Sequence, residues 1–342
     1  MPRDVPSIAR EDGRTGHWLL KKFHVSQQGI VFVLFVIMFA GFALFLRGFA
    51  QVDNLLTLLQ NVAILGILGL GMSVVVIGRG IDISMIAALA VPSGLLLQLM
   101  QNGMSVPSAC AVALGLSLVF GLVNGWLIAY AEVPSLFTTL ASGLFLAGCG
   151  QAFFFQLEVV QWPASLDALA WMGRGNFAGV PMPVVMFGLS AAALALFLKR
   201  TRAGAFIYAI GDNPFGARAA GLPTRPIMVL QYVMAALIGV FAGIVMAASV
   251  NSMPTRIYNS TMIYDVVLVV VLGGIGLSGG RGGVLNVIIG TLLIGTMLNG
   301  MTILDVSYSV QNIVKGVVLL VAILVDSIFN PRNEETAQQG DI

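Results

Sequence analysis

Charged residues are scarce in this sequence. Lys, Arg, Asp and Glu together make up 9% of the 342 residues, whereas about 25% is usual in a soluble domain. A 36.0 kDa protein with so few charges could not cover its surface in water, which excludes a soluble enzyme and a disordered chain. The formal net charge of +2 is too small to indicate a nucleic-acid partner.

Groups that usually carry catalysis are also few. Both histidines, His17 and His24, lie near the N-terminus, and the two cysteines, Cys110 and Cys149, sit in apolar runs as small hydrophobic residues do. The sequence contains no GxxxxGK[ST] phosphate loop and no metal-ligand spacing. We therefore expect no catalytic site, metal or cofactor in this chain.

Apolar residues, in contrast, are abundant. They make up 58% of the chain, and the mean hydropathy is +0.95. A membrane-spanning helix needs about 20 mostly apolar residues, so the supply suffices for about ten. We predict an all-α polytopic membrane protein with spans at 29–47, 55–78, 84–102, 107–130, 134–156, 182–198, 226–250, 264–277, 284–302 and 310–329.

The basic residues predict the orientation of these spans. With the N-terminus in the cytoplasm, 13 of the 17 Lys and Arg residues fall on the inner side, as the positive-inside rule requires. Only Arg47, Arg174 and Arg256 fall outside, and Lys315 lies within the last span. We expect tails at 1–28 and 330–342, both cytoplasmic, and one membrane domain at 29–329 whose longest inner loop is about 199–225.

Glycines interrupt two of the spans. Gly78 and Gly80 flank one break, and the string GGIGLSGGRGG, beginning at Gly273, makes the eighth span short and broken or re-entrant. Exposed backbone groups in lipid cost several kcal/mol each, so such breaks must be buried or face water. They are candidates for a solute pathway, or for close helix packing through small residues.

The two breaks also resemble each other. Residues 74–78 followed by GIDIS match 269–273 followed by GIGLS if Arg79 is counted as an insertion. We interpret this as a weak repeat of broken-helix elements. Together with polar residues inside the spans, the candidate pathway residues are Asn61, Gly78, Gly80, Asp82, Asn124, Thr138, Gly273, Gly274 and Asn299.

Few charges lie at membrane depth, where they are functional candidates. Asp82 is expected to pair with Arg79 or to cap a helix. Glu132 and Asp326 lie near span ends and are expected to be solvated. Lys315 is expected either to snorkel toward the membrane surface or to pair with an acid that the sequence does not identify. Sodium- or proton-coupled carriers use more such groups, which points to an energy source outside the chain.

A short helix is predicted within the inner loop. Asn213 precedes Pro214, which suits the first position of a helix, and Gly221 suits its end. The helix Phe215–Ala220 is too short to be stable alone and needs a surface to dock on.

This loop is one of five segments in which the sequence resembles the sugar-type permeases of bacterial ATP-binding-cassette importers. That family includes the ribose, xylose, arabinose and galactose systems. The resemblance runs from about Val52 to Phe329. It is carried by five ordered blocks: GMSVVVIGRGIDIS, NGWLIAYAEVPSLFTTLA, RAGAFIYAIGDNPFGARAAGLP, VVLGGIGLSGGRGGVLNVIIGTLLIG and QNIVKGVVLLVAILVD.

The resemblance implies a permease subunit of the bacterial inner membrane that works as a pair, as a homodimer or with a related permease. It would take a neutral sugar or sugar-like solute from a periplasmic binding protein, driven by separate cytoplasmic ATPase subunits that hold the ATP and Mg²⁺. By this likeness, the coupling residues that dock on the ATPase are Asp212, Asn213, Pro214, Phe215, Gly216, Ala217, Arg218, Ala219, Ala220 and Gly221.

Two other functions remain open from the residues alone. A stand-alone ion-coupled transporter of a small polar solute would need coupling-ion ligands in its core, and those are sparse. A membrane-embedded enzyme acting on lipids would need an Asp-rich or His-rich cluster, which the sequence lacks.

Overall fold

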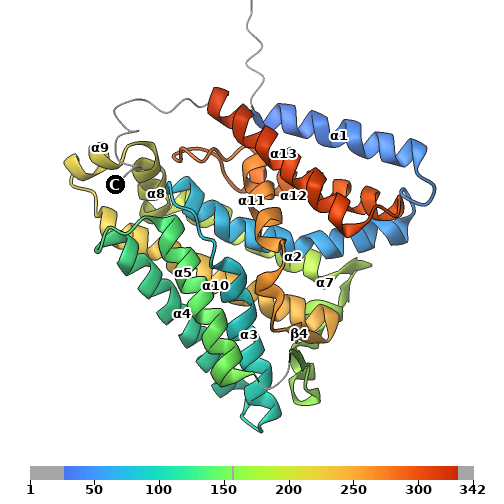
Figure 1. Ribbon diagram of the computed structural model, residues 1–342, viewed down its shortest axis with the longest axis horizontal. Helices are drawn as coiled ribbons and strands as arrows, with labels where there is room; N and C mark the ends of the chain where they lie inside the picture. Colours follow the sequence, from blue (N-terminus) through green and yellow to red (C-terminus); the bar gives the residue numbers. More distant parts are fainter. Residues whose placement is uncertain (1–26, 156–157, 330–342) are drawn as a thin grey trace, which may run out of the picture.

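The computed structural model describes residues 27–155 and 158–329 and is almost entirely helical (Figure 1). The first half contains α1 (Gln27–Phe45), α2 (Val52–Ile77), α3 (Met85–Gln101), α4 (Val106–Ala129), α5 (Ser135–Cys149) with a π-helical extension (Gly150–Phe154), and α6 (Asp167–Arg174). The second half contains α7 (Met182–Arg200), α8 (Arg202–Asp212), α9 (Pro214–Ala219), α10 (Thr224–Val250), α11 (Met262–Leu272), α12 (Val284–Ile303) and α13 (Tyr308–Phe329).

Eight of these helices are long and apolar enough to span a membrane, and α3 and α11 are shorter apolar helices. Nine of the predicted spans are thus present with ends shifted by a few residues. The eighth, predicted at 264–277, is wrong in extent. Helix α11 ends at Leu272 after 11 residues, which gives about 16 Å against the roughly 30 Å of a bilayer core. Gly273 and the residues after it continue as irregular chain.

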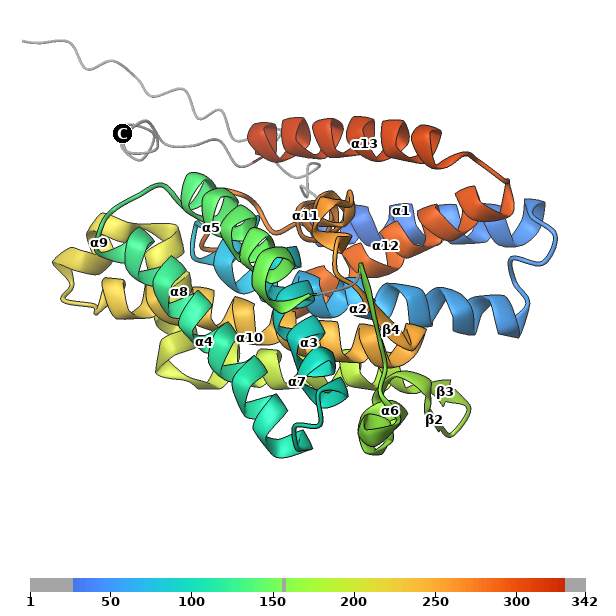
Figure 2. The same ribbon diagram turned by 60° about the horizontal axis from the view of Figure 1, so that its bottom comes forward.

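Helix α2 forms the centre of the bundle. Its apolar window is 83% buried, whereas that of α13 is 11% buried. Helix α13 accordingly lies along the outside (Figure 2). An α2 surrounded by protein can be apolar on every side, which explains its lack of an amphipathic pattern.

Small residues bring the central helices together. An ideal Cβ added to Gly121 or Gly125 of α4 would lie 2.6 Å from the Cα of Val233 or Val229 of α10. Gly243 packs in the same way against the Leu89 carbonyl of α3. The pairs Gly121 with Gly125 and Gly239 with Gly243, each separated by three residues, are therefore helix contacts.

The two ends of the bundle differ. Helices α8 and α9 lie at one end (left in Figure 2), and α6 with the short strands lies at the other. Strand β1 (Val159–Gln161) pairs antiparallel with β4 (Ser252–Pro254), and β2 (Asn176–Phe177) pairs with β3 (Val180–Pro181). Short 3-10 turns occur at Ala164–Leu166 and Ile257–Asn259. The predicted tails, with His17 and His24, lie outside the described residues except where α1 begins at Gln27.

Candidate functional site

The predicted loop at 199–225 contains two helices instead of one. Thr201 caps α8, because its Oγ1 accepts a hydrogen bond from the Gly204 amide at 3.0 Å. Asn213 then separates α8 from α9 and caps α9, accepting from the Gly216 amide at 2.8 Å. The chain leaves α9 through Gly221, whose φ of +75° suits glycine. The short helix and its cap were predicted, whereas α8 was not.

Helix α9 presents an open surface. Ala217 is its buried side chain, and Phe215, Gly216, Arg218 and Ala219 are exposed. Helices of this length depend on tertiary contacts, and α9 has such contacts on its inner side only. Its outer side has the small residues, the aromatic ring and the cation that a partner surface could contact.

The two glycine breaks have the same pattern of backbone hydrogen bonds. At the end of α2, the amides of Gly78, Arg79 and Gly80 donate to the carbonyls of Val74, Val76 and Val75. At the end of α11, the amides of Gly273, Gly274 and Ile275 donate to the carbonyls of Val269, Val271 and Val270. Both are Schellman caps.

This equivalence corrects the predicted alignment of the repeat. Arg79 (φ 71°) and Gly274 (φ 89°) occupy the same left-handed position, so Arg79 is not an insertion. The match is residue for residue through the cap, and the two sequences diverge immediately after it.

The end of α8 contacts both breaks. The Gly280 amide donates to the Ile77 carbonyl, the last of α2, at 2.8 Å. Gly211 of α8 packs directly against the same carbonyl, and an ideal Cβ on Gly280 would lie 2.7 Å from the Asp212 Cα. The end of α8, whose last residue Asp212 begins the segment predicted to couple to an ATPase, is therefore in main-chain contact with the break after α2 and with the loop after α11.

Polar side chains gather where α2 breaks and α3 begins. Asp82 accepts hydrogen bonds from the Ser84 amide (3.0 Å) and the Ser84 hydroxyl. Asn124 of α4 donates to the same hydroxyl at 3.1 Å. All three residues are at least 98% buried. Asp82 thus bonds to Ser84, the N-cap residue of α3, and does not itself occupy the N-cap position of that helix.

Two members of this polar cluster were missed from the sequence. The Gln231 side chain of α10 contacts Gly78, and the Tyr232 hydroxyl contacts Gly80. Both are polar residues inside an apolar run, and that signal could have identified them. On the neighbouring α5, Thr139 accepts from the Ile83 amide at 3.1 Å, and the predicted pathway residue Thr138, the residue before it, is buried on the same helix.

The cluster is not fully satisfied by hydrogen bonds. Within the described residues, three of its buried atoms have no partner: Asn124 Oδ1, Gln231 Nε2 and Tyr232 Oη. An unpaired buried polar atom costs about 1–3 kcal/mol. The arrangement therefore retains donors and acceptors that a neutral hydroxylated solute could use.

Other predicted pathway residues lie elsewhere. Asn299 forms a reciprocal amide pair with Asn54 at 3.0 and 3.1 Å, joining α12 to the start of α2. Asn61 is exposed on α2. Gly273 lies against Asn286 of α12, which donates to its carbonyl at 2.7 Å, and Gly274 forms the α11 cap. The structure thus joins Gly78, Gly80, Asp82 and Asn124 but separates them from Asn61 and Asn299.

Two of the remaining membrane-depth charges, Lys315 and Asp326, bind α13 to the rest of the bundle. Lys315 Nζ lies 2.9 Å from Asp265 Oδ1 and donates to Oδ2 at 3.1 Å, which identifies its partner. Asp326 was predicted to be solvated, but it is 6% exposed and accepts from the Leu277 amide at 3.2 Å. Asp326 is buried between α13 and the irregular segment 273–283, so its carboxylate does not reach solvent, contrary to the prediction. Glu132 is exposed, as expected, and pairs with Arg225 at 3.0 Å.

The described residues contain no group of three or more His, Cys, Asp and Glu side chains that could hold a metal ion.

Residues 54–323 match the family model described as the permease component of the branched-chain amino acid transport system. The chain is 33% identical over 281 residues to the ribose import permease protein RbsC of Escherichia coli (strain K12), covering 82% of this chain and 87% of that protein. It is also 33% identical over 292 residues to RbsC of Bacillus subtilis (strain 168), covering 81% and 86%.

A third relative is the galactofuranose transporter permease protein YtfT of Escherichia coli (strain K12), at 32% identity over 270 residues, covering 79% of this chain and 78% of that protein. No solved structure matches the chain.

Proposed function

Since this chain belongs to the family of permease components of the branched-chain amino acid transport system, we propose that it is the membrane subunit of an ATP-binding-cassette importer for a neutral sugar. The printed names of the relatives, which specify ribose and galactofuranose, support a sugar over an amino acid. The polar cluster supports the same class, because its three unpaired atoms all belong to uncharged side chains. The chain itself would have no catalytic site, and ATP and Mg²⁺ would bind to partner ATPase subunits.

The orientation completes the proposal. The bias of Lys and Arg supports cytoplasmic termini and, with them, a cytoplasmic location for α8 and α9. A periplasmic binding protein would then deliver the solute at the opposite end, where α6 and the short strands lie. A second permease subunit, identical or related, would complete the complex.

One observation carries the coupling mechanism: the end of α8 is in backbone contact with both glycine breaks. An ATPase that docks on α9 and closes would displace α8. That displacement would reach the end of α2 and the loop after α11 without crossing a mobile side chain. The polar cluster begins at the same break, so the mechanism links ATPase closure to the solute contacts.

The test is a substitution on the outer side of α9. Gly216→Glu adds volume and charge to an exposed position, whereas Gly216→Ala adds only a methyl group. In proteoliposomes with the ATPase, binding protein and sugar, we expect Gly216→Glu to abolish sugar-stimulated ATP hydrolysis and ATPase pull-down. Gly216→Ala should retain both. Normal association and stimulated turnover in Gly216→Glu would place the docking surface elsewhere.

The same vesicles distinguish this function from an ion-coupled carrier. Permease reconstituted alone should not move sugar when a sodium or proton gradient is imposed. Sugar uptake driven by such a gradient would contradict the importer assignment.

A further inference from the structure

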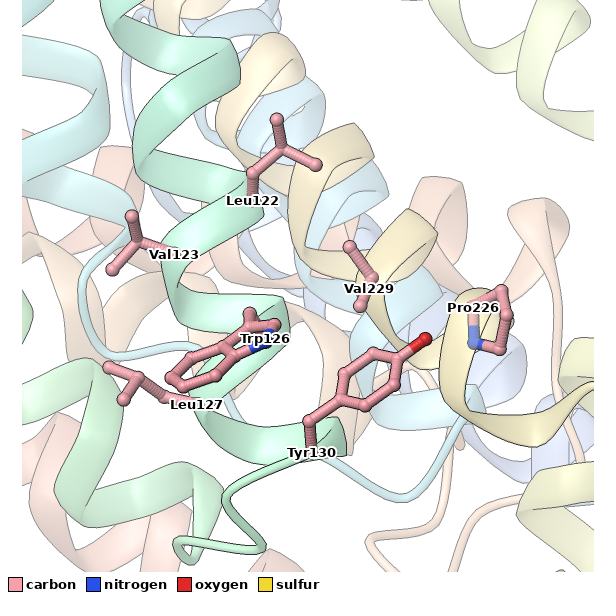
Figure 3. Close-up of a pocket in the computed structure, with 7 residues that line it drawn as sticks. All are labelled: Leu122, Val123, Trp126, Leu127, Tyr130, Pro226 and Val229. Atoms are coloured by element: carbon pink, nitrogen blue, oxygen red, sulfur yellow. The ribbon is translucent and has the colours of Figure 1, made fainter.

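Helices α4 and α10 form an apolar groove on the outer surface of the bundle (Figure 3). Its volume is about 730 Å³, and its walls come from α4 and the first turns of α10. Trp126 is 56% exposed and Tyr130 is 45% exposed. The Tyr130 ring is drawn facing Pro226 and Val229 of α10, and the Trp126 ring lies between Tyr130 and Leu127.

The helix packing explains the shape of the groove. Gly121 and Gly125 bring the backbones of α4 and α10 into contact. The larger side chains beside this contact project outward and line the two sides of the groove. Pro226 lies in the first turn of α10, where amides lack helical partners, and proline has no amide to leave unpaired. The groove therefore presents apolar side chains.

Two opposite charges lie at the mouth of the groove. Arg225 Nη2 is 3.0 Å from Glu132 Oε1, and the two side chains are 48% and 61% exposed. The Arg225 guanidinium carbon also lies 5.5 Å from the centre of the Tyr130 ring. Tyrosine and tryptophan favour the membrane–water interface, and the charges beyond them lie where lipid headgroups would be.

We propose that this groove binds one phospholipid whose headgroup carries both a phosphate and a primary ammonium, as phosphatidylethanolamine does. One acyl chain would lie between Leu122, Trp126 and Val229. The phosphate would pair with Arg225, and the ammonium would donate to Glu132. This inference depends on the chain being a membrane protein and does not depend on its transport function.

The headgroup assignment follows from the charge pair. A purely anionic headgroup would meet the Glu132 carboxylate, and like charges repel. A quaternary ammonium has no N–H to donate to that carboxylate. A headgroup with adjacent opposite charges can replace the Arg225–Glu132 pair with two ion pairs, phosphate with Arg225 and ammonium with Glu132. Both new pairs would be partly exposed.

The exposed Trp126 ring provides the measurement. Wild-type protein and Trp126→Phe are placed in nanodiscs containing dibrominated lipids, whose bromines quench nearby tryptophan. Subtracting the two signals isolates Trp126 from Trp18, Trp162 and Trp171. Half-quenching by dibrominated phosphatidylethanolamine should need about three-fold less lipid than by phosphatidylcholine with identical chains, the order expected for one exposed ion pair.

The charge variants test which groups confer this preference. Trp126 in Glu132→Gln should be quenched equally by both lipids, because the ammonium loses its anionic partner. Arg225→Gln should weaken quenching by both. Thermal unfolding midpoints equal to wild type would show that the variants are folded, and Glu132→Gln suffices if Arg225→Gln does not fold.

Three results would overturn the proposal. Equal quenching by both lipids in the wild type would mean an unselective lipid annulus. Stronger quenching by phosphatidylglycerol than by phosphatidylethanolamine would mean an anionic-lipid site. Absence of Trp126 quenching by any lipid would mean that a second protein copy covers the groove.

Discussion

The ion pair between α11 and α13 gives the sharpest stability prediction. The Lys315 and Asp265 side chains are 7% and 14% exposed, so each charge depends on the other for solvation. Thr261 adds an acceptor for Lys315 at 3.3 Å. Lys315→Met retains most of the side-chain volume but leaves the Asp265 carboxylate without its cation.

The expected cost follows from the burial. Removing one partner of a buried pair destabilises a protein by about 3–5 kcal/mol. At about 2 °C per kcal/mol for a chain of this size, the Tm should fall by about 6–10 °C. Replacing both residues, as Lys315→Met with Asp265→Leu, removes the uncompensated charge, and the double variant should return to within about 1 kcal/mol of wild type.

Thermal unfolding of the purified permease in nanodiscs measures both effects. The single and double variants form a mutant cycle, and its coupling energy isolates the pair from other losses. The control substitution is Val317→Met on the same helix, where the Val317 side chain is 55% exposed. If Lys315→Met lowered the Tm no more than this control, or if the two losses were additive in the double variant, the argument that each charge needs the other would be refuted.

Three further predictions concern the site and the orientation. Gln231→Leu removes a buried donor that has no partner, so the Tm should be unchanged or higher while sugar uptake falls; unchanged uptake would remove Gln231 from the pathway. Gly280 has a left-handed φ of +72°, and a Cβ added there would lie 2.7 Å from the Asp212 Cα. Gly280→Ala should therefore strain the contact with α8 and impair ATP-driven uptake. Gly179→Ala, at φ +83° with open space around it, is the matched control and should not, so equal effects would mean that strain alone is responsible. Single cysteines in 158–181 should react with an impermeant maleimide added outside cells and those in 199–225 should not; equal labelling would contradict the orientation.

The sequence predicted the helices well because apolar length is a local property. The span predicted at 84–102 is Met85–Gln101, and that at 284–302 is Val284–Ile303. The cap at Asn213 was predictable for the same reason, because the amide that it accepts from lies three residues away. Helix α8 was missed because it has only 11 residues and contains Gly204 and Gly211, so no long apolar run marked it.

Contacts between segments far apart in the chain could not be predicted from the sequence. Lys315 and Asp265 are 50 residues apart, and their pairing depends on how two helices are rotated about their axes. The Arg79 position was misread because residue identity suggested an insertion, whereas the left-handed cap equates it with Gly274. The contact of α8 with Ile77 and Gly280 involves backbone atoms, and side-chain patterns do not encode backbone contacts directly.

That backbone contact has a mechanical consequence. Side chains placed between two moving helices can change rotamer, and each such change takes up part of an imposed displacement. The contacts of Gly211 with the Ile77 carbonyl and of Gly280 with Asp212 contain no rotatable side-chain bond on the glycine side. The junction is therefore stiff under compression, and a small movement at the surface of α9 would reach the start of the polar cluster with little loss of amplitude.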